Sequence, residues 1–238
     1  MKKRIWELDA FRGICVLGMV LVHLVYDLVD LYQLIPWKYP AFFLFVKDWG
    51  GVTFLMISGI SATLGSHSVR RGLMVLACSL VVSGATVVMY LMGMANRGII
   101  IWFGVLQCLG VCMLAWAVLK KLPTWVQMIL GIALVAAGLY IRGRVFGTPE
   151  WMMPLGFVFP GFVSSDYFPV MPHLGFFLLG AVAGKWLYPQ KKSLFPKVSG
   201  DRGLAGFLCL CGRWSLPIYM LHQPVLTGIT GLIAWVVK

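Results

Sequence analysis

The stretch Leu8-Asp9-Ala10-Phe11-Arg12-Gly13-Ile14-Cys15-Val16-Leu17-Gly18-Met19-Val20-Leu21-Val22-His23-Leu24-Val25-Tyr26-Asp27 decides the fold class, because it is an apolar segment that also carries charge. At about 20 residues it is long enough to cross the hydrocarbon core of a bilayer as a helix. Asp9, Arg12, His23 and Asp27 share one stripe of that helix at about 100° per residue. Each charge inside a membrane costs about 2.5–3.5 kcal/mol on insertion scales. The stripe therefore predicts a functional site, with a salt-bridge network that only joins helices as the alternative.

The composition of the whole chain agrees with a membrane protein. The chain has 238 residues, of which 60% are hydrophobic and only 12% are charged. These values exclude an ordinary soluble domain and predict an all-α, polytopic transmembrane helix bundle that forms a single domain over residues 1–238. The apolar segments predict about seven spans, at residues 8–30, 41–64, 70–92, 98–119, 124–141, 168–188 and 213–237. Two stretches are expected to be short interfacial or re-entrant segments, at residues 151–163 and 204–211.

The net charge of +12 does not indicate a nucleic-acid-binding protein, because the positive residues lie in short loops between the apolar spans. This distribution follows the positive-inside rule and makes anionic lipid headgroups the nearest partners. Alternate loops carry twelve Lys and Arg residues on one side and six on the other. The richer side holds Lys2, Lys3, Arg4, Arg70, Arg71, Lys120, Lys121, Lys185, Lys191, Lys192, Lys197 and Arg202. We therefore expect a cytoplasmic N-terminus, and a C-terminus outside if seven spans are present.

The cysteines are expected to be reduced packing residues, since all six lie in apolar stretches. No cluster of Cys, His and carboxylate residues has the spacing of a metal site, so no metal is expected. The Gly180–Gly184 pair has GxxxG spacing, which is typical of close helix contact. That contact is expected to be intramolecular, with a homodimer as the alternative.

The depth of the polar residues along the spans predicts two polar zones, at about 1.5 Å of rise per residue. The outer zone contains His23, Asp27, Asp48, Asp166 and His173, and the inner zone contains Asp9, Arg12, Lys185 and Arg213. His222, Gln223 and Gln107 are expected between the two zones. Asp27 lies one helical turn beyond His23, where a carboxylate would fix the tautomer of the imidazole and raise its basicity.

Each of these residues also has a structural interpretation. Asp9 and Arg12 could pair with each other or with Arg213, and Lys185 could be a snorkelling residue at a helix end. Asp166 could cap the sixth span, and His173 could bond a carbonyl freed by the neighbouring prolines. The His222-Gln223-Pro224 sequence could serve only to satisfy a helix that proline opens.

Several motifs together resemble one family. The segment Arg4-Ile5-Trp6-Glu7-Leu8-Asp9-Ala10-Phe11-Arg12-Gly13, followed by His23, is similar to the opening of the heparan-alpha-glucosaminide N-acetyltransferase-like family, in its bacterial branch. Four further pieces resemble that family in the same order along the chain: Phe54–Gly59, Phe103–Gly110, Asp166–Gly180 and Gly212–Pro224. Two features depart from its pattern. Cys108 replaces an arginine after Gly104-Val105-Leu106-Gln107, and no histidine lies between His23 and His67.

The resemblance implies a membrane acyltransferase of N- or O-acetyltransferase type. Such an enzyme would move an acetyl or short acyl group from cytosolic acetyl-CoA to an extracytoplasmic or membrane-associated sugar or amino sugar. On this interpretation His23, Asp27 and His222 are catalytic candidates. The co-substrate candidates are Arg12, Gln107, Lys185 and Arg213, and the acceptor candidates are Asp48, Asp166 and His173. The expected location is a bacterial cytoplasmic membrane. The alternative function is a small-solute or proton-coupled transporter, since proton relays also use intramembrane His and Asp residues.

Overall fold

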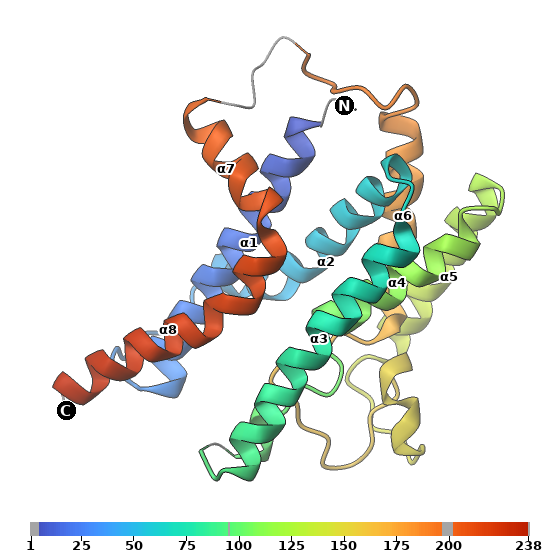
Figure 1. Cartoon of the computed structure of the whole chain (residues 1–238). Helices are drawn as coiled ribbons and strands as arrows, with labels where there is room; N and C mark the ends of the chain where they lie inside the picture. Colours follow the sequence, from blue (N-terminus) through green and yellow to red (C-terminus); the bar gives the residue numbers. More distant parts are fainter. Residues whose placement is uncertain (1–4, 95, 197–201, 238) are drawn as a thin grey trace. The chain divides into compact units, whose positions relative to one another are not determined.

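The computed structural model describes residues 5–94, 96–196 and 202–237, and its elements are helices (Figure 1). The long helices are α1 (Trp6–Tyr26), α2 (Ala41–Leu64), α3 (Ser68–Leu91), α5 (Thr124–Ile141), α6 (Val170–Leu187) and α8 (Ser215–Val237). Two helices are shorter, α4 (Val105–Leu119) and α7 (Gly203–Arg213). A π-helical turn, η1 (Asp27–Leu31), continues α1, and two 3-10 turns are η2 (Arg97–Ile99) and η3 (Glu150–Leu155).

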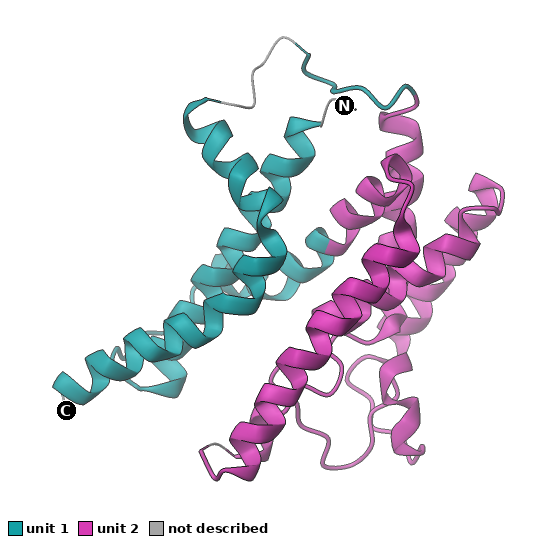
Figure 2. Ribbon diagram, viewed as in Figure 1, with its two compact units in different colours: residues 1–54, 190–238 teal, residues 55–189 magenta. Residues whose placement is uncertain are grey.

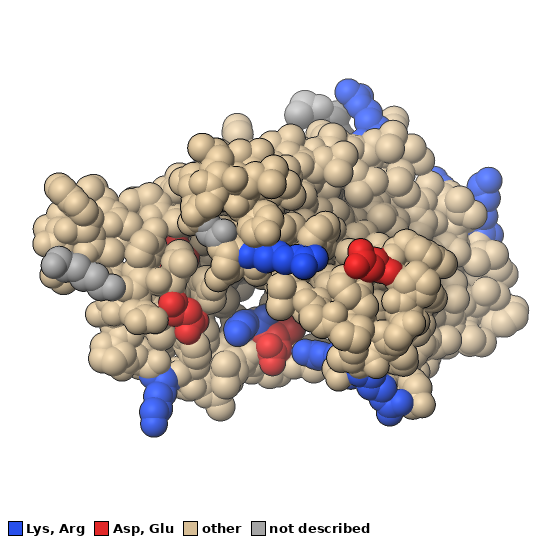
Figure 3. All heavy atoms as spheres, turned by 90° about the horizontal axis from the view of Figure 1, so that it is seen from below, with Lys and Arg blue, Asp and Glu red and all other residues tan. Residues whose placement is uncertain are grey.

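The six long helices are each apolar and long enough to cross a membrane, within the ranges that the structure describes. Their outer surfaces carry large apolar side chains, among them Phe42 at 77% exposed and Trp235 at 80% exposed. Charged side chains cover little of the face seen in Figure 3. Such a surface suits lipid rather than water. The prediction of an all-α polytopic bundle is therefore confirmed.

The described residues divide into two compact units, coloured separately in Figure 2. Unit 1 comprises residues 1–54 and 190–238, and unit 2 comprises residues 55–189. In unit 1, α7 and α8 pack on α1. In unit 2, α3 packs on α4 and α5 packs on α6. The single domain expected over residues 1–238 stays a prediction. Lys2, Lys3, Arg4, Lys197 and Lys238, which entered the orientation count, lie outside the described residues.

Within unit 1, α8 runs parallel to α1 (Figure 1). His23 lies against His222, Asp27 bonds Gln223, and the Tyr32 hydroxyl donates to the Thr227 carbonyl oxygen at 3.1 Å, so residue numbers rise together on both helices. Two parallel spans are separated by an odd number of crossings. The helices α2 to α6 supply five crossings only if α4 is one of them. Six of the described helices are long and apolar enough to span and α4 is shorter than these, so the seven spans expected stay a prediction.

The fourth predicted span, residues 98–119, is α-helical only from Val105, after the 3-10 turn η2 and an extended segment. Gly104 is extended at φ −87° and ψ −176°, and the segment before it pairs with the loop that precedes α6. The Phe168 amide donates to the Phe103 carbonyl oxygen at 2.8 Å, and the Ser165 hydroxyl donates to the Ile99 carbonyl oxygen at 2.7 Å. These bonds satisfy backbone groups that a helix would otherwise use. At 15 residues, α4 covers about 22 Å.

Glycines allow the closest helix contacts in both units. In unit 1, a Cβ added at Gly13 or Gly212 would overlap the backbone of the other helix at the crossing of α1 and α7. In unit 2, a Cβ at Gly180 would lie 2.8 Å from Cα of Met56, and one at Gly184 would lie 2.9 Å from Cα of Ile60. The GxxxG pair of α6 therefore packs on α2 within the chain, which confirms the intramolecular expectation. A homodimer stays a prediction.

The segment 204–211 lies in α7, which has 11 residues and covers about 16 Å. It is too short to span a membrane. Cys209, Cys211 and Gly212 are its buried residues. All six cysteines of the chain are free, and four of them are buried, as packing residues would be.

Candidate active site

Two histidines from different helices meet in unit 1. The ring centroids of His23 on α1 and His222 on α8 are 4.8 Å apart, with the planes at 77° in an edge-to-face arrangement. Both side chains are half-buried. The sequence prediction placed His222 between two polar zones, whereas the parallel course of α1 and α8 brings it to the level of His23. The two leading histidine candidates therefore belong to one site.

Backbone carbonyls set the tautomer of both rings. Nδ1 of His23 lies 2.9 Å from the carbonyl oxygen of Met19, and Nδ1 of His222 lies 2.6 Å from the carbonyl oxygen of Tyr219. A carbonyl oxygen can only accept, so Nδ1 carries the proton in each neutral ring. Each Nε2 then keeps its lone pair, which is the state that a general base or nucleophile needs.

Asp27 lies beside this pair and is fully buried at 0% exposed. Its Oδ1 accepts a 2.9 Å hydrogen bond from Nε2 of Gln223 on α8, and Gln223 Nε2 also donates to the Thr227 hydroxyl at 3.3 Å. Asp27 opens the π-helical turn η1, a type of turn that is frequent at functional sites. The carboxylate thus fixes the amide of Gln223 in place.

The sequence predicted that Asp27 would fix the tautomer of His23, and this prediction is wrong. The carbonyl of Met19 holds Nδ1 of His23, and the carboxylate of Asp27 is directed to Gln223 instead. The reason is the helix surface itself. Nδ1 of His23 donates its proton to the carbonyl oxygen of Met19, four residues earlier on the same helix. No Nδ1 proton is then left for the carboxylate of Asp27, four residues later.

Three buried polar atoms at this site have no hydrogen-bond partner in the part of the chain that the structure describes. They are Oδ2 of Asp27, Oε1 of Gln223 and Nε2 of His222. With the tautomer given above, all three are acceptors. Buried acceptors without partners are costly, at about 1–3 kcal/mol each. A site that gathers three of them is suited to a ligand or water molecules that donate hydrogen bonds.

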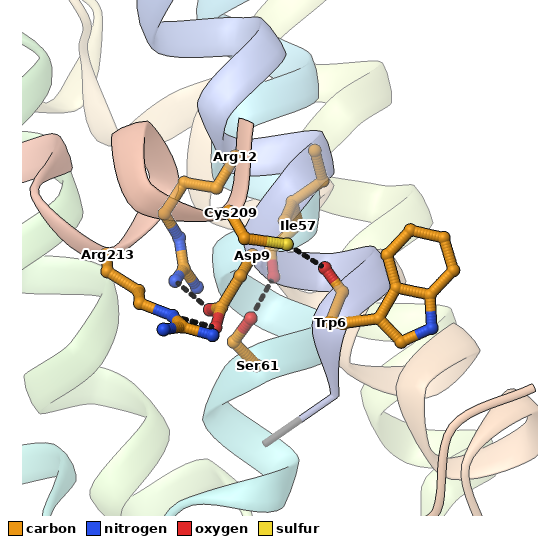
Figure 4. Close-up of polar contacts among 7 residues, drawn as sticks. All are labelled: Trp6, Asp9, Arg12, Ile57, Ser61, Cys209 and Arg213. Carbon is orange, nitrogen blue, oxygen red and sulfur yellow. Dashed lines mark hydrogen bonds and ion pairs between the residues drawn. The ribbon is translucent and has the colours of Figure 1, made fainter. Parts of the chain in front are cut away.

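A second polar group in unit 1 surrounds Asp9 on α1 (Figure 4). Asp9 is buried, and its Oδ1 lies 3.6 Å from Nη1 of Arg12 while its Oδ2 lies 3.4 Å from Nε of Arg213 on α7. Next to it, the Cys209 thiol contacts the Trp6 carbonyl oxygen at 3.3 Å. Two guanidinium groups therefore share one carboxylate and keep a net positive charge. The pairing that the sequence offered as a structural alternative is present.

Lys185, the fourth inner-zone residue, lies in unit 2. Its Nζ donates to Oε1 of Gln127 at 2.9 Å and lies 5.6 Å from the centroid of the Trp116 ring. Gln127 is fully buried and donates at 2.9 Å to the carbonyl oxygen of Leu119, the last residue of α4, and at 2.9 Å to the carbonyl oxygen of Leu122 in the turn that follows. Lys185 thus joins a capping network of α4, α5 and α6.

Gln107 and Asp166 meet at the opposite end of α4. Oε1 of Gln107 accepts from the Gly104 amide at 3.0 Å, while its Nε2 donates to the Ser83 hydroxyl at 2.5 Å. Oδ2 of Asp166 accepts from the Val105 amide at 3.0 Å. The alternative that Asp166 caps the sixth span is wrong, because it caps α4. Next to it, burial raises the pKa of the Tyr167 hydroxyl, which donates to the Met153 carbonyl oxygen.

The two remaining acceptor candidates lie apart from this network. Nδ1 of His173 donates to the Pro169 carbonyl oxygen at 2.6 Å, and the buried ring packs on Phe168. This is the carbonyl bond that its neighbouring prolines suggested. Asp48 is exposed on the part of α2 that belongs to unit 1. The structure therefore gathers His23, Asp27 and His222, and separately Asp9, Arg12 and Arg213.

The chain matches the family model described as heparan-alpha-glucosaminide N-acetyltransferase, catalytic, over residues 4–224. It belongs to this family. The matched range contains all ten candidate site residues, including both histidines of the α1–α8 pair. No significant match was found among curated proteins or among solved structures. Family membership supports a membrane acetyltransferase, and the family recognised from the sequence motifs is confirmed, while its bacterial branch stays a prediction.

Some polar residues of this family member were not predicted as site residues. Gln223 was noted only as lying between the zones, although it binds Asp27 directly. Gln127 and Ser83 were not singled out, and they are the partners of Lys185 and Gln107. A polar side chain inside an apolar span is the signal that would have found them. Glu7 was also missed. It is buried and accepts from the Ser193 hydroxyl and the Leu194 amide, which tie the segment before α7 to α1.

Proposed function

We propose that this family member transfers an acetyl or short acyl group from acyl-CoA to a sugar or amino-sugar acceptor at the His23–His222 pair. Acetyl-CoA is the donor that the family uses in general. The observation that carries the proposal is the pair itself, two half-buried imidazoles with free Nε2 lone pairs beside the buried Asp27 and Gln223. Acyl transfer needs such a base where water is scarce.

In the proposed reaction, Nε2 of His23 takes the proton from an acceptor hydroxyl or amine. The acceptor oxygen or nitrogen then bonds to the thioester carbonyl carbon, and the C–S bond breaks. The CoA thiolate leaves and takes up the proton from the imidazolium. The carboxylate of Asp27 stabilises that imidazolium electrostatically while it exists. In the variant route, Nε2 of His23 attacks the thioester carbonyl carbon, the C–S bond breaks and the CoA thiolate leaves. The acceptor oxygen or nitrogen then attacks the acyl-imidazolium, the C–N bond to Nε2 breaks, and the acceptor's proton passes to the thiolate. His222 is the second candidate for either role.

The acceptor is proposed to bind through its own hydrogen-bond donors. Oδ2 of Asp27, Oε1 of Gln223 and Nε2 of His222 are buried acceptors that its hydroxyl or amino groups would satisfy. Asp48, Asp166 and His173 stay proposed as acceptor contacts. For Asp166 and His173, the bonds to Val105 and Pro169 favour structural roles instead.

The donor is proposed to approach from the cytoplasm, near Arg12 and Arg213. Both arginines share Asp9, so the group keeps net positive charge for phosphate oxygens. Asp9 and His23 are 14 residues apart on α1, which is about 21 Å along the helix. The long pantetheine arm of CoA suits that separation. Lys185 and Gln107 were also assigned to the donor, and their bonds to Gln127 and Ser83 favour capping roles.

The proposed setting is a bacterial cytoplasmic membrane with the N-terminus in the cytoplasm. The Lys and Arg asymmetry supports this orientation, and the parallel course of α1 and α8 supports a C-terminus on the opposite side. A proton-coupled transporter is the second candidate function. The buried Asp27 next to two histidines favours it, because proton relays use such groups.

Reconstituted protein separates these two functions. Purified full-length chain in proteoliposomes is given radiolabelled acetyl-CoA on the cytoplasmic side and a panel of amino sugars and neutral sugars on the other side. We expect labelled acetyl-sugar in the wild type and in Leu21→Ala, a control on a lipid-exposed position of α1. Sugar uptake without acetylation, dependent on a pH gradient, would overturn the transferase proposal and favour the transporter.

A further inference from the structure

The orientation of the Gln223 side-chain amide is fixed by its two neighbours. Its Nε2 donates to Oδ1 of Asp27 at 2.9 Å and to the Thr227 hydroxyl oxygen at 3.3 Å. The only proton of that hydroxyl is donated to the Gln223 backbone carbonyl oxygen at 2.7 Å. Both neighbours therefore face the amide with lone pairs. An amide turned the other way would place oxygen against oxygen, so the observed orientation is the one that the chemistry allows.

This orientation leaves the side chain of Gln223 with one role toward a bound molecule. Both amide protons are already bonded, so only the oxygen Oε1 is available. Oε1 is buried and has no hydrogen-bond partner in residues 5–94, 96–196 and 202–237. A buried amide oxygen normally bonds a protein group, a water molecule or a ligand. Gln223 is therefore arranged to accept a hydrogen bond from a molecule that enters the site.

The site holds more acceptor atoms than one reacting group can satisfy. Oδ2 of the fully buried Asp27 and Nε2 of His222 are also buried and without a partner in the part of the chain that the structure describes. A reacting hydroxyl has one proton, and in the proposed reaction Nε2 of His23 takes it. The other acceptors need protons from further groups of the same molecule. A ring with several hydroxyl groups supplies them, whereas a monohydric alcohol does not.

We infer that Gln223 is a specificity-determining residue, which accepts a hydrogen bond from a hydroxyl group of the sugar acceptor other than the reacting group. The inference rests on the proposed transferase function and narrows its acceptor to a polyhydroxylated ring. A site built to bond a hydroxyl group rejects an analogue that lacks it, because the buried acceptor atom is then left unpaired. Asp27 and Thr227 contribute to this selection as positioning residues, since they hold the Gln223 amide in its orientation.

The test measures binding to the full-length protein in detergent by calorimetry, without acetyl-CoA, so that it does not depend on turnover. The probes are glucosamine and glucose, each compared with the deoxy analogues that lack one of its hydroxyl groups. The readout is the ratio of the Kd of an analogue to the Kd of its parent sugar, taken within each protein variant. A merely structural role of Gln223 would weaken all probes alike and leave this ratio unchanged.

The variants are Gln223→Met and Asp27→Asn, with Leu221→Ala as the matched control on an exposed position of the same helix α8. Methionine has a similar length and lacks the amide oxygen. In Asp27→Asn, the asparagine amide nitrogen donates to Oε1 of Gln223, and the amide turns so that Nε2, a donor, faces the site. That variant keeps the pair bonded, so the test stays decisive if Gln223→Met does not fold.

In wild type and Leu221→Ala, we expect at least one deoxy analogue to bind about 10–100-fold more weakly than its parent sugar. In Gln223→Met and Asp27→Asn, the ratio for that analogue should fall close to one. The inference would be overturned if every analogue bound wild type as tightly as its parent, if wild type bound neither parent sugar, or if Gln223→Met kept the wild-type ratio.

A parallel transfer assay with labelled acetyl-CoA separates this inference from the proposed function. Acetyl transfer to the parent sugars and their analogues at equal rates and affinities would overturn the inference alone. Discrimination in binding that Gln223→Met abolishes, without any acetyl transfer by wild type, would overturn the transferase proposal and would still support the recognition of a sugar hydroxyl by Gln223.

Discussion

Gly212→Ala is predicted to weaken the crossing of α1 and α7. A Cβ at position 212 would overlap the Asp9 carbonyl oxygen and would lie 2.7 Å from the Asp9 carbonyl carbon and 3.0 Å from the Gly13 amide nitrogen. All three are backbone atoms, so no side-chain rotation relieves the overlap. The helices must move apart, and Arg213 moves away from Asp9 with them.

The magnitude follows from two opposing terms. Overpacking costs about 1–3 kcal/mol, whereas Gly→Ala inside a helix gains up to about 1 kcal/mol. Gly18→Ala on α1 is the matched control. Nothing lies within 4 Å of its added Cβ, so this variant should show the gain in helix stability without any overlap. The difference between the two variants therefore isolates the overlap, at about 1–3 kcal/mol.

The assay is thermal unfolding of detergent-solubilised protein, followed by the fluorescence of its ten tryptophans. At about 2–4 °C per kcal/mol for a chain of this size, Gly212→Ala should melt about 2–12 °C below Gly18→Ala. Equal melting temperatures for the two variants would refute the close approach of α1 and α7.

Further outcomes follow from other contacts. Gln127→Leu should lower the free energy of unfolding by about 1–3 kcal/mol, because the Leu122 carbonyl loses its partner, while the Leu119 carbonyl keeps the Leu122 amide and the Lys185 ammonium keeps the Thr124 hydroxyl; an unchanged denaturation midpoint would contradict that network. Asp166→Ala should cost about 1 kcal/mol through loss of the α4 cap, measured by thermal unfolding, and Asp166→Asn should restore most of it; a far larger effect on acetyl transfer than on stability would instead favour acceptor binding. Single cysteines at Lys191 and Gly147 should react with impermeant maleimide from opposite sides of the membrane, and labelling from one side would break the seven-span topology.

The fold class could be predicted from the sequence because length and apolar character suffice to identify spans. Residues 41–64 and 124–141 were predicted with the bounds that α2 and α5 have. The start of α4 could not be predicted, since its first residues are apolar and continue the hydropathy of the span. They are extended because they pair with a loop about 65 residues further along the chain, which a local pattern does not contain.

Within the candidate site, only the contacts inside a single helix could be predicted from the sequence. His23 and Asp27 could be predicted to share one face of α1, because the geometry of a helix fixes the spacing of residues along it. The contact between His23 and His222 depends on how α8 runs along α1, and no spacing within either helix reveals that. Likewise, Met19 rather than Asp27 orients His23, because backbone carbonyls compete for side-chain protons.

The kinetics of acetyl transfer by His23→Gln test the central claim most directly. Glutamine keeps a polar side chain of similar length and lacks a group that can accept the proton, so folding and donor binding should survive. We expect a turnover rate about 10²–10⁴-fold below wild type, with the affinity for acetyl-CoA, measured by calorimetry, within a few-fold of wild type. A variant that keeps most of the wild-type turnover rate would contradict the role of His23. If His222→Gln were then inactive, the base would be His222. If both variants stayed active, catalysis by histidine would be wrong.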